Sequence, residues 1–193
     1  MNKIFIASNN AHKISEIREI LKNHSLDIEI LSPASFSDDT EPEENGKTYA
    51  ENAYIKAKYY YDKYHYPTLA DDSGISIRFL NNQPNIHSAR FLSSYSANER
   101  NCIICEVMKY AIDRYACFET VICFIHDDVT EYFSGKAEGE IAMTPMGEKG
   151  FGYDPIFYKP EYGKTMGELG EVVKNQISHR ALALDEWVRS LEK

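Results

Sequence analysis

The sequence predicts an α/β fold in which a mixed β-sheet is flanked by helices. Short apolar runs alternate with longer segments that carry apolar residues at helical spacing. Near the middle, two strand-like segments, residues 117–128 and 129–142, meet at Asp-Asp, which is typical of a β-hairpin. The 193 residues, 43% of them apolar, suffice for one core, and no linker or repeat divides them. We therefore expect one domain over residues 1–193.

The chain opens with a strand, a helix and a second strand. Residues 3–8 form one short apolar run and residues 27–31 form another. Residues 9–24, between them, place four apolar side chains on one helical face: Ile14, Ile17, Ile20 and Leu21. This order is typical of a βαβ unit. Residues 32–46 are polar and acidic with two prolines, so we expect a loop there.

The following segments complete the predicted layers. Residues 47–64 indicate a helix with a stripe of small residues, Ala50, Ala53 and Ala57, that allows close packing. Residues 68–80 predict two strand pieces broken at Asp-Ser-Gly, and residues 97–113 predict another helix. Glycines at 147, 150 and 152 predict a loop before a short strand, and residues 175–193 predict one final amphipathic helix.

Charge and hydropathy narrow the class of protein. The formal net charge is −9, from 30 acidic and 21 basic residues, which disfavours binding to a nucleic-acid backbone. A small anionic ligand would then need a local cationic pocket or a metal ion. We find no signal-peptide pattern and no apolar run of membrane-spanning length. We expect a soluble, cytoplasmic protein with no membrane partner.

The four cysteines have two possible interpretations, as ligands of a zinc site or as buried thiols. Cys102 and Cys105 have a spacing found in zinc sites, but they lie in an apolar-rich helical pattern without turn residues. Cys117 and Cys123 fall on one face of a predicted strand. We favour reduced cysteines that pack as small hydrophobic residues.

The loop after the first strand has the character of a phosphate site. It lacks the glycine signatures of P-loop and dinucleotide-binding proteins. A strand that leads into a helix nevertheless leaves free backbone N–H groups and a positive dipole end. Ser8, Asn9 and Asn10 can donate or cap there, and Lys13 can add positive charge. A plain helix cap at Asn10 and a solvated Lys13 are the alternatives.

Acidic residues in two separated segments can form a Mg²⁺ site. Mg²⁺ usually takes one or two protein carboxylates and completes its shell with water and phosphate oxygens. Asp71 or Asp72, together with Glu44 from the acidic loop, would supply that set. The alternative is a solvated acidic surface, which is the usual fate of such runs and would include Asp38, Asp39, Glu43 and Glu44.

Two later segments are further candidates for ligand binding, and the first of them suits a ring-shaped ligand. Glycines around Phe151 and Tyr153 would let aromatic rings and backbone approach a base closely, although burial in the core explains such rings equally well. His179 and Arg180 lie near the start of the last predicted helix, with Lys174 in the preceding loop. A solvated helix face is the alternative for this pair.

Read together, these stretches resemble the inosine triphosphate pyrophosphatase family. The matching pieces are "SNNAHK" (8–13), "EENGKTYAENAYIKA" (43–57), "LADDSG" (69–74), "SAR" (88–90), "GFGYDPIF" (150–157) and "ISHRALAL" (177–184). They occur in family order and span nearly the whole chain. The resemblance implies the elongated, two-lobed inosine triphosphatase-like fold and a homodimer.

The resemblance also implies an activity and a role for each site residue. It implies Mg²⁺-dependent hydrolysis of the purine nucleotides ITP, dITP and XTP to monophosphate and pyrophosphate. Glu44 and Asp72 would hold the metal, and Asp72 would be the catalytic proton acceptor. The triphosphate would lie on the loop from Ser8 to Lys13. The remaining residues would bind phosphate or sugar (Lys56, Ser73, Lys174) and base (Phe151, Gly152, Tyr153, Asp154, His179, Arg180).

Base selectivity has a physical account in the same residues. Inosine and xanthosine present a carbonyl where adenine presents an amine, and the guanidinium of Arg180 only donates hydrogen bonds. Adenine would therefore leave a buried donor unpaired. Two alternatives stay open at this point: a pyrophosphatase for modified pyrimidine nucleotides, and a nucleotide-binding protein without catalytic activity.

Overall fold

The computed structural model describes residues 2–191 as a mixed sheet with helices on it. The strand order is β2-β1-β3-β5-β6-β7-β8, with β4 paired to β3. β1 is parallel to both β2 and β3, whereas β7 is antiparallel to β6 and β8. The strands are β1 Lys3–Ile6, β2 Glu29–Leu31, β3 Thr68–Ile77, β4 Gln83–Pro84, β5 Tyr115–His126, β6 Val129–Ile141, β7 Phe157–Lys159 and β8 Lys164–Thr165. The predicted α/β fold is confirmed.

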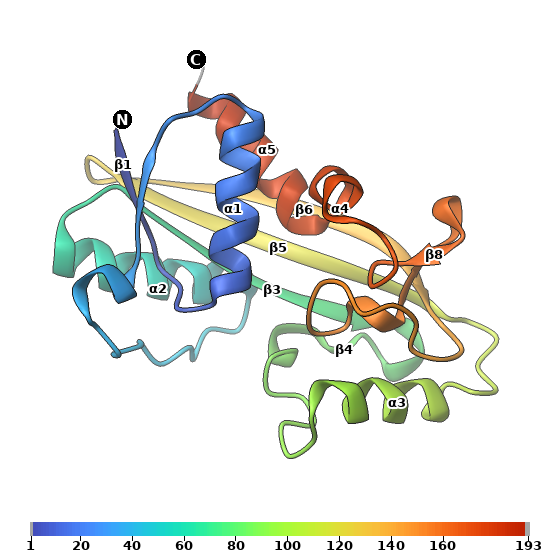
Figure 1. Ribbon diagram of the computed structural model, residues 1–193. Coiled ribbons are helices and arrows are strands. Elements are labelled where there is room, and N and C mark those ends of the chain that lie inside the picture. Colours follow the sequence, from blue (N-terminus) through green and yellow to red (C-terminus); the bar gives the residue numbers. More distant parts are fainter. Residues whose placement is uncertain (1, 192–193) are drawn as a thin grey trace. The chain divides into compact units, whose positions relative to one another are not determined.

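The helices and long strands are traced in Figure 1. The helices are α1 Ala11–Asn23, α2 Tyr49–Tyr64, α3 Ala97–Val107, α4 Glu171–Ile177 and α5 His179–Leu191. The chain divides into two compact units. Unit 1 holds the chain up to Asp72, Thr120–Gly135 and the chain from His179, and unit 2 holds Ser73–Glu119 and Lys136–Ser178. Strands β3, β5 and β6 each contribute residues to both units.

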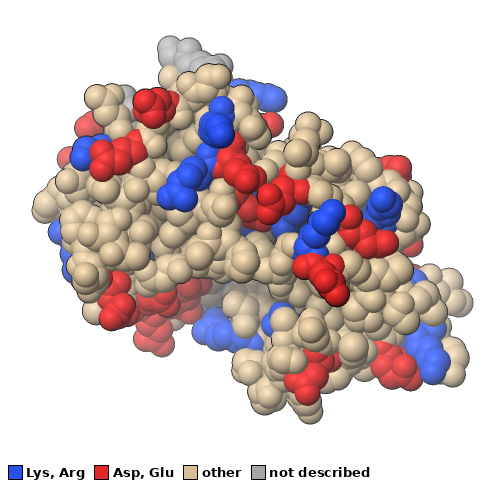
Figure 2. All heavy atoms as spheres, in the orientation of Figure 1, with Lys and Arg blue, Asp and Glu red and all other residues tan. Residues whose placement is uncertain are grey.

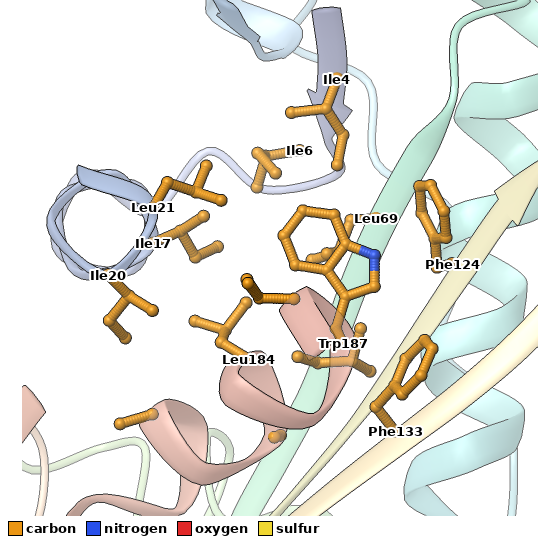
Figure 3. Packing of buried hydrophobic residues seen from close by; sticks show 14 residues of the cluster. Ile4, Ile6, Ile17, Ile20, Leu21, Leu69, Phe124, Phe133, Leu184 and Trp187 are labelled. Carbon is orange, nitrogen blue, oxygen red and sulfur yellow. The ribbon is translucent and has the colours of Figure 1, made fainter. Parts of the chain in front are cut away.

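Unit 1 buries both faces of its part of the sheet. Alternate residues of β1 enter different clusters: Ile4 and Ile6 pack with α1 and α5, while Phe5 packs with α2. Figure 3 shows Trp187 of α5 among side chains of β1, α1 and β5. Its ring meets Phe124 edge-on, with centroids 5.5 Å apart. Two buried faces explain why the first strand reads as a continuous apolar run.

Unit 2 has a separate hydrophobic core, packed against α3. Ile104 and Cys105 of α3, with Met108 just after the helix, pack with residues of β3, β5, β6 and β7 in one cluster. Tyr153 belongs to the same cluster and is 5% exposed. The loop that contains it is therefore fixed by apolar packing on one side.

Gly135 lets α5 sit directly on β6. A Cβ at this position would lie 2.1 Å from the carbonyl oxygen of His179 and 2.6 Å from the amide nitrogen of Ala183. Both atoms belong to the backbone and cannot swing away. The absence of a side chain at Gly135 thus fixes where α5 begins, and with it His179 and Arg180.

Gly135→Ala is expected to destabilise the protein by about 1–3 kcal/mol, the usual cost of overpacking a core. Reduced entropy of the unfolded chain offsets only ~0.4–1 kcal/mol of this. Gly170→Ala is the matched control, because nothing lies within 4 Å of that position. Urea unfolding measures both variants, and equal midpoints for the two would contradict the close contact.

Three predicted boundaries are wrong. In place of the two strand pieces expected in residues 68–80, the single strand β3 runs through Asp71, Asp72, Ser73 and Gly74 without a break, and Arg78–Leu80 form a 3₁₀ turn. Pairing with neighbouring strands outweighs the local turn tendency of Asp-Ser-Gly. The helix expected over 97–113 ends at Val107. The guanidinium of Arg114 donates to the carbonyl oxygen of Met108 just after that end, and Ile112 is fully exposed, so no core face prolongs the helix.

The helix expected over 175–193 is two helices. Ser178 is extended, with φ −73° and ψ 150°, and separates α4 from α5. Lys174, expected in a loop, lies inside α4 and is buried. His179 and Arg180 are the first residues of α5, as predicted. The hairpin β5–β6 and its Asp-Asp turn are also confirmed, since Asp127 and Asp128 both have positive φ.

The cysteines are free thiols in different surroundings. Burial raises the pKa of Cys105 to about 11 and that of Cys123 to about 12. Cys102 is exposed on α3. Because the thiolate is the reactive form, we expect Ellman's reagent to label Cys102 quickly and Cys105 and Cys123 only after unfolding. Equal rates for all three in the native protein would contradict this packing.

Two surface properties complete the description. On the described atoms of the face in Figure 2, acidic and basic side chains are interspersed, with no continuous basic area. Among residues 2–191, no helix is both long enough and apolar enough to span a bilayer.

Candidate active site

Side chains of the loop between β1 and α1 cap the amino-terminal end of α1 and bind within the loop. Asn10 Oδ1 accepts hydrogen bonds from the amide nitrogens of His12 (3.0 Å) and Lys13 (3.3 Å), so the cap reading of Asn10 is confirmed. Ser8 Oγ accepts from the amide of Asn10 at 3.1 Å. Asn9 Nδ2 donates to Glu41 at 3.2 Å. These bonds hold the positive end of α1 in place.

Asp71 is the buried centre of an ionic network in unit 1. It is 3% exposed and accepts hydrogen bonds from Lys13 Nζ at 3.0 Å and from Nε and Nη2 of Arg180 at 3.3 Å each. The Nη1 atom of Arg180 binds Glu16. Lys13 is therefore not a solvated lysine, and Arg180, 3% exposed, is not on a solvated helix face.

The charges of this network decide how its groups ionise. Burial alone would raise the pKa of Asp71, but Lys13, Arg180 and Lys56 together hold it well below its usual range. Burial lowers the pKa of Lys13, and the neighbouring Arg180 and Lys56 add to that effect against the attraction of Asp71. Asp71 is thus a permanent anion that anchors Lys13 and Arg180. Of the two carboxylates considered for a metal, Asp71 is therefore the one whose side chain is already occupied by Lys13 and Arg180.

Asp72, the next residue of β3, meets a different set of groups. It is 8% exposed, accepts from Asn52 Nδ2 at 3.0 Å and lies 3.4 Å from Lys56 Nζ. Lys56 Nζ is also 3.4 Å from Glu44. Burial raises the pKa of Asp72, with smaller contributions from Glu44 and Asp71 against the attraction of Lys56. Two successive residues of β3 therefore differ in acidity: the pKa of Asp71 is lowered, and that of Asp72 is raised.

Asn52 joins the two segments that carry Glu44 and Asp72. Its side chain is buried on α2, and while Nδ2 donates to Asp72, Oδ1 accepts from the amide of Gly46 at 2.9 Å. A Cβ on Gly46 would lie 2.6 Å from Asn52 Oδ1, so only glycine permits this approach. Asn52 was not among the predicted site residues. Its position four residues before Lys56, on the same helical face, was the available signal.

The chemistry of Glu44 and Asp72 fits a hard divalent ion. Both carboxylates lie within 3.4 Å of one ammonium nitrogen, so the fold already holds a cation between them. No cluster of three or more His, Cys, Asp and Glu side chains suited to a metal occurs among residues 2–191. A pair of carboxylates suits a hard ion that completes its shell with water and phosphate oxygens better than an ion that needs four protein ligands. Glu43, in contrast, is exposed.

Unit 2 brings together the aromatic loop and Lys174. Asp154 is 5% exposed and accepts hydrogen bonds from Lys174 Nζ and from the amide of Phe151, both at 2.8 Å. Lys174 Nζ also lies 5.0 Å from the ring centroid of Phe151. A Cβ on Gly150, where φ is +76°, would lie 2.1 Å from Asp154 Oδ2. Glycine at position 150 therefore makes room for the Asp154 carboxylate.

Two contacts hold Tyr153, and a third holds the neighbouring Gly152. Its hydroxyl donates to the carbonyl of Ser88 at 2.6 Å, and the guanidinium of Arg100 lies 4.2 Å from its ring centroid. Asn101 Nδ2 donates to the carbonyl of Gly152 at 2.9 Å. The core-packing reading therefore holds for Tyr153, whereas Phe151 is only half-buried. Helix α3 supports this loop, a role that the sequence analysis did not assign to it.

The predicted site residues thus fall into two groups. Unit 1 gathers Lys13 and Arg180 around Asp71, and Glu44 and Asp72 around Lys56. The capped loop at Ser8, Asn9 and Asn10 and the buried His179 belong to the same unit. Unit 2 gathers Phe151, Gly152, Tyr153, Asp154 and Lys174, and Ser73 also belongs to it.

Comparison with known proteins identifies the family. The sequence pattern of the Ham1 family matches residues 4–190. The chain belongs to the Ham1 family. Two relatives, both named dITP/XTP pyrophosphatase, illustrate the similarity. That of Dictyoglomus thermophilum is 44% identical over 187 residues, covering 95% of this chain and 91% of the relative. That of Clostridium perfringens is 41% identical, covering 100% of this chain and 98% of the relative.

Solved structures of Ham1 proteins share the fold. The Ham1 protein of Staphylococcus aureus superimposes with a TM-score of 0.87 at 36% identity, over 99% of this chain and 98% of that one. The HAM1 protein of Coxiella burnetii gives a TM-score of 0.88 at 38% identity, over 100% and 99% of the two chains. The fold expected from the sequence is therefore confirmed, and it is the fold that these Ham1 proteins share.

Proposed function

We propose that this Ham1 protein is a nucleoside triphosphate pyrophosphatase that hydrolyses dITP, XTP and ITP to the monophosphate and pyrophosphate. The observation that carries the proposal is the arrangement around Lys56, where Glu44 and Asp72 share one ammonium group beside the anchored Lys13. The names of relatives that match nearly the whole chain support the substrate class. The 193 residues act as one catalytic domain in this proposal, since three strands contribute to both units.

Glu44 and Asp72 are the residues that would hold Mg²⁺. When bound, the ion would neutralise charge on the triphosphate and on the leaving pyrophosphate. Asp72 would accept the proton of the attacking water. Its raised pKa suits this role, because a more basic carboxylate is a better proton acceptor.

Cationic side chains would bind the phosphates. Lys13 is held in place by Asp71, and Lys56 by the two metal carboxylates. Positioned positive charge stabilises the developing negative charge of the leaving group more than it stabilises the bound substrate. The capped loop of Ser8, Asn9 and Asn10 would receive the triphosphate at the amino-terminal end of α1. Ser73 and Lys174 would contact phosphate or sugar.

Base binding is proposed for Phe151 to Asp154 and, separately, for the start of α5. Phe151, which is half-buried, would stack on the purine, while Gly152 lets the backbone approach. His179 and Arg180 would face the carbonyl that replaces the amine of adenine. Arg180 can only donate, so a purine with an amine at this place leaves a donor unpaired.

A substrate panel tests the proposal. The purified protein should release pyrophosphate from dITP, XTP and ITP when Mg²⁺ is present and lose this activity in EDTA. Faster turnover of modified pyrimidine triphosphates would favour the pyrimidine pyrophosphatase alternative. Nucleotide binding without turnover at any Mg²⁺ concentration would favour the non-catalytic alternative.

The oligomeric state and location belong to the same proposal. We propose a homodimer that acts in the cytoplasm, where it would remove deaminated purine nucleotides from the pool. Light scattering at micromolar protein concentration should give twice the chain mass of 22.1 kDa. The mass of one chain would reject the dimer.

A further inference from the structure

The loop that carries Glu44 has little regular structure of its own. Between the 3₁₀ turn Pro33–Phe36 and α2, the chain forms neither helix nor strand. Figure 1 shows this segment running beside α2, within unit 1. A carboxylate on such a loop can bind a metal well only if other contacts fix the loop. The contacts that fix this loop therefore bear on how well Glu44 can bind a metal.

Asp38 ties one end of the loop to α2. Its side chain is 7% exposed and accepts hydrogen bonds from Lys63 Nζ and Tyr64 Oη, both at 2.7 Å. Within the loop it also accepts from Thr40, through Oγ1 at 2.6 Å and the amide at 3.1 Å. Hydrogen bonds from Lys63, Thr40 and Tyr64 hold the pKa of Asp38 below its usual range. The carboxylate therefore remains charged at neutral pH.

Thr40 and Phe36 extend these contacts. The carbonyl of Thr40 accepts from Tyr60 Oη at 2.6 Å, and Thr40 Oγ1 lies 2.8 Å from Tyr59 Oη. The ring of Phe36 stacks on Tyr64, with centroids 4.3 Å apart. All of these partners lie on the last two turns of α2. We call Asp38, Thr40, Lys63 and Tyr64 the Asp38 clasp.

Glu44 lies between two fixed points. On one side are the Asp38 clasp and the hydrogen bond from Asn9 to Glu41. On the other side the amide of Gly46 binds Asn52, the residue that also binds Asp72. Only a few residues separate these points, so loosening one of them widens the range of positions open to Glu44.

We propose that Asp38 is a positioning residue that sets the divalent-ion affinity of the Glu44 and Asp72 pair. It does so by fastening the loop to the carboxyl-terminal end of α2, about two helical turns after Lys56. Asp38 contacts neither ion nor substrate in this proposal. The inference rests on the proposed function, in which Glu44 is a metal ligand.

The test measures metal binding without turnover. Mn²⁺ affinity of the nucleotide-free protein is determined by calorimetry for wild type and Asp38→Asn. Loss of a group that binds a metal ligand directly typically weakens metal binding about 10–100-fold. Because Asp38 acts on Glu44 only through the loop, we expect Asp38→Asn to lie at the lower end, at about tenfold. Hydrogen exchange of the loop amides should rise in the same variant, and saturating Mg²⁺ should restore most of its kcat.

Asp62→Asn is the matched control. Asp62 lies on the same helix and pairs with Lys58, but its side chain is 57% exposed and does not contact the loop. Its Mn²⁺ affinity should equal that of wild type. If Asp38→Asn is insoluble, Tyr64→Phe keeps the aromatic stack and removes one donor, and it should weaken Mn²⁺ binding by about two- to tenfold.

Glu44→Gln distinguishes failure of the positioning role of Asp38 from failure of the metal assignment of Glu44. If Glu44→Gln weakens Mn²⁺ binding while folded Asp38→Asn and Tyr64→Phe both bind as wild type, the positioning role is wrong and the metal assignment stands. If Glu44→Gln itself binds Mn²⁺ as wild type, the metal assignment fails and the positioning role fails with it. Weakening in Glu44→Gln and Asp38→Asn, with Asp62→Asn unchanged, supports both.

Discussion

Asp72→Asn is expected to fold, to bind dITP, and to release pyrophosphate about 10²–10⁴-fold more slowly than wild type, the usual contribution of a general base. The amide has nearly the shape of the carboxylate but cannot accept a proton. Burial already disfavours the charged form of Asp72, so a neutral group there should be tolerated by the fold. Initial rates of pyrophosphate release at saturating Mg²⁺ measure the effect, and fluorescence titration measures nucleotide binding.

Glu43→Gln provides the control for Asp72→Asn. Glu43 precedes the metal-binding candidate Glu44 but is exposed, so its loss should leave the rate unchanged. Wild-type turnover in Asp72→Asn would remove Asp72 from the role of proton acceptor. Unfolding of that variant, detected by circular dichroism, would instead show a structural requirement for the charge.

Changes at Arg180 are expected to reduce base selectivity. In Arg180→Ala, Asp71 loses two donated bonds and Glu16 loses one, and breaking such a buried pair costs about 3–5 kcal/mol of stability. Arg180→Lys keeps a positive charge but not the planar fork. It should therefore remain folded while its preference for dITP over dATP narrows by about 10–100-fold, the worth of a hydrogen bond from a charged donor. Ratios of kcat/KM for the two nucleotides measure this.

Glu16→Gln is the matched control for Arg180→Lys. It removes the other carboxylate of the network and leaves every donor of Arg180 in place. Its selectivity should stay within about threefold of wild type. If Arg180→Lys keeps the wild-type ratio, base selectivity lies in other residues, and Arg180 serves only to hold Asp71 and Glu16.

Periodicity predicted the local elements well. The apolar spacing of Ile17, Ile20 and Leu21 identified α1 and its buried face, because a helix repeats every 3.6 residues. The Asp127-Asp128 turn identified the β5–β6 hairpin, because few residues accept positive φ at both turn positions. These features depend on neighbours in the sequence, which are visible before folding.

Features that depend on distant partners were not predictable from pattern alone. The turn tendency of Asp71-Asp72-Ser73-Gly74 suggested a break, and only neighbouring strands keep this stretch extended. The resemblance to a known family named Asp72 and Arg180 as site residues, but not every partner that holds them. Asn52 is one such partner, and its role became visible only when α2 lay beside β3.

Product analysis by ³¹P NMR tests the central proposal most directly. Purified protein is incubated with dITP, once with Mg²⁺ and once with EDTA. We predict equimolar dIMP and pyrophosphate with Mg²⁺ and intact dITP with EDTA. Release of dIDP and inorganic phosphate, or intact dITP at every Mg²⁺ concentration, would contradict the proposed pyrophosphatase.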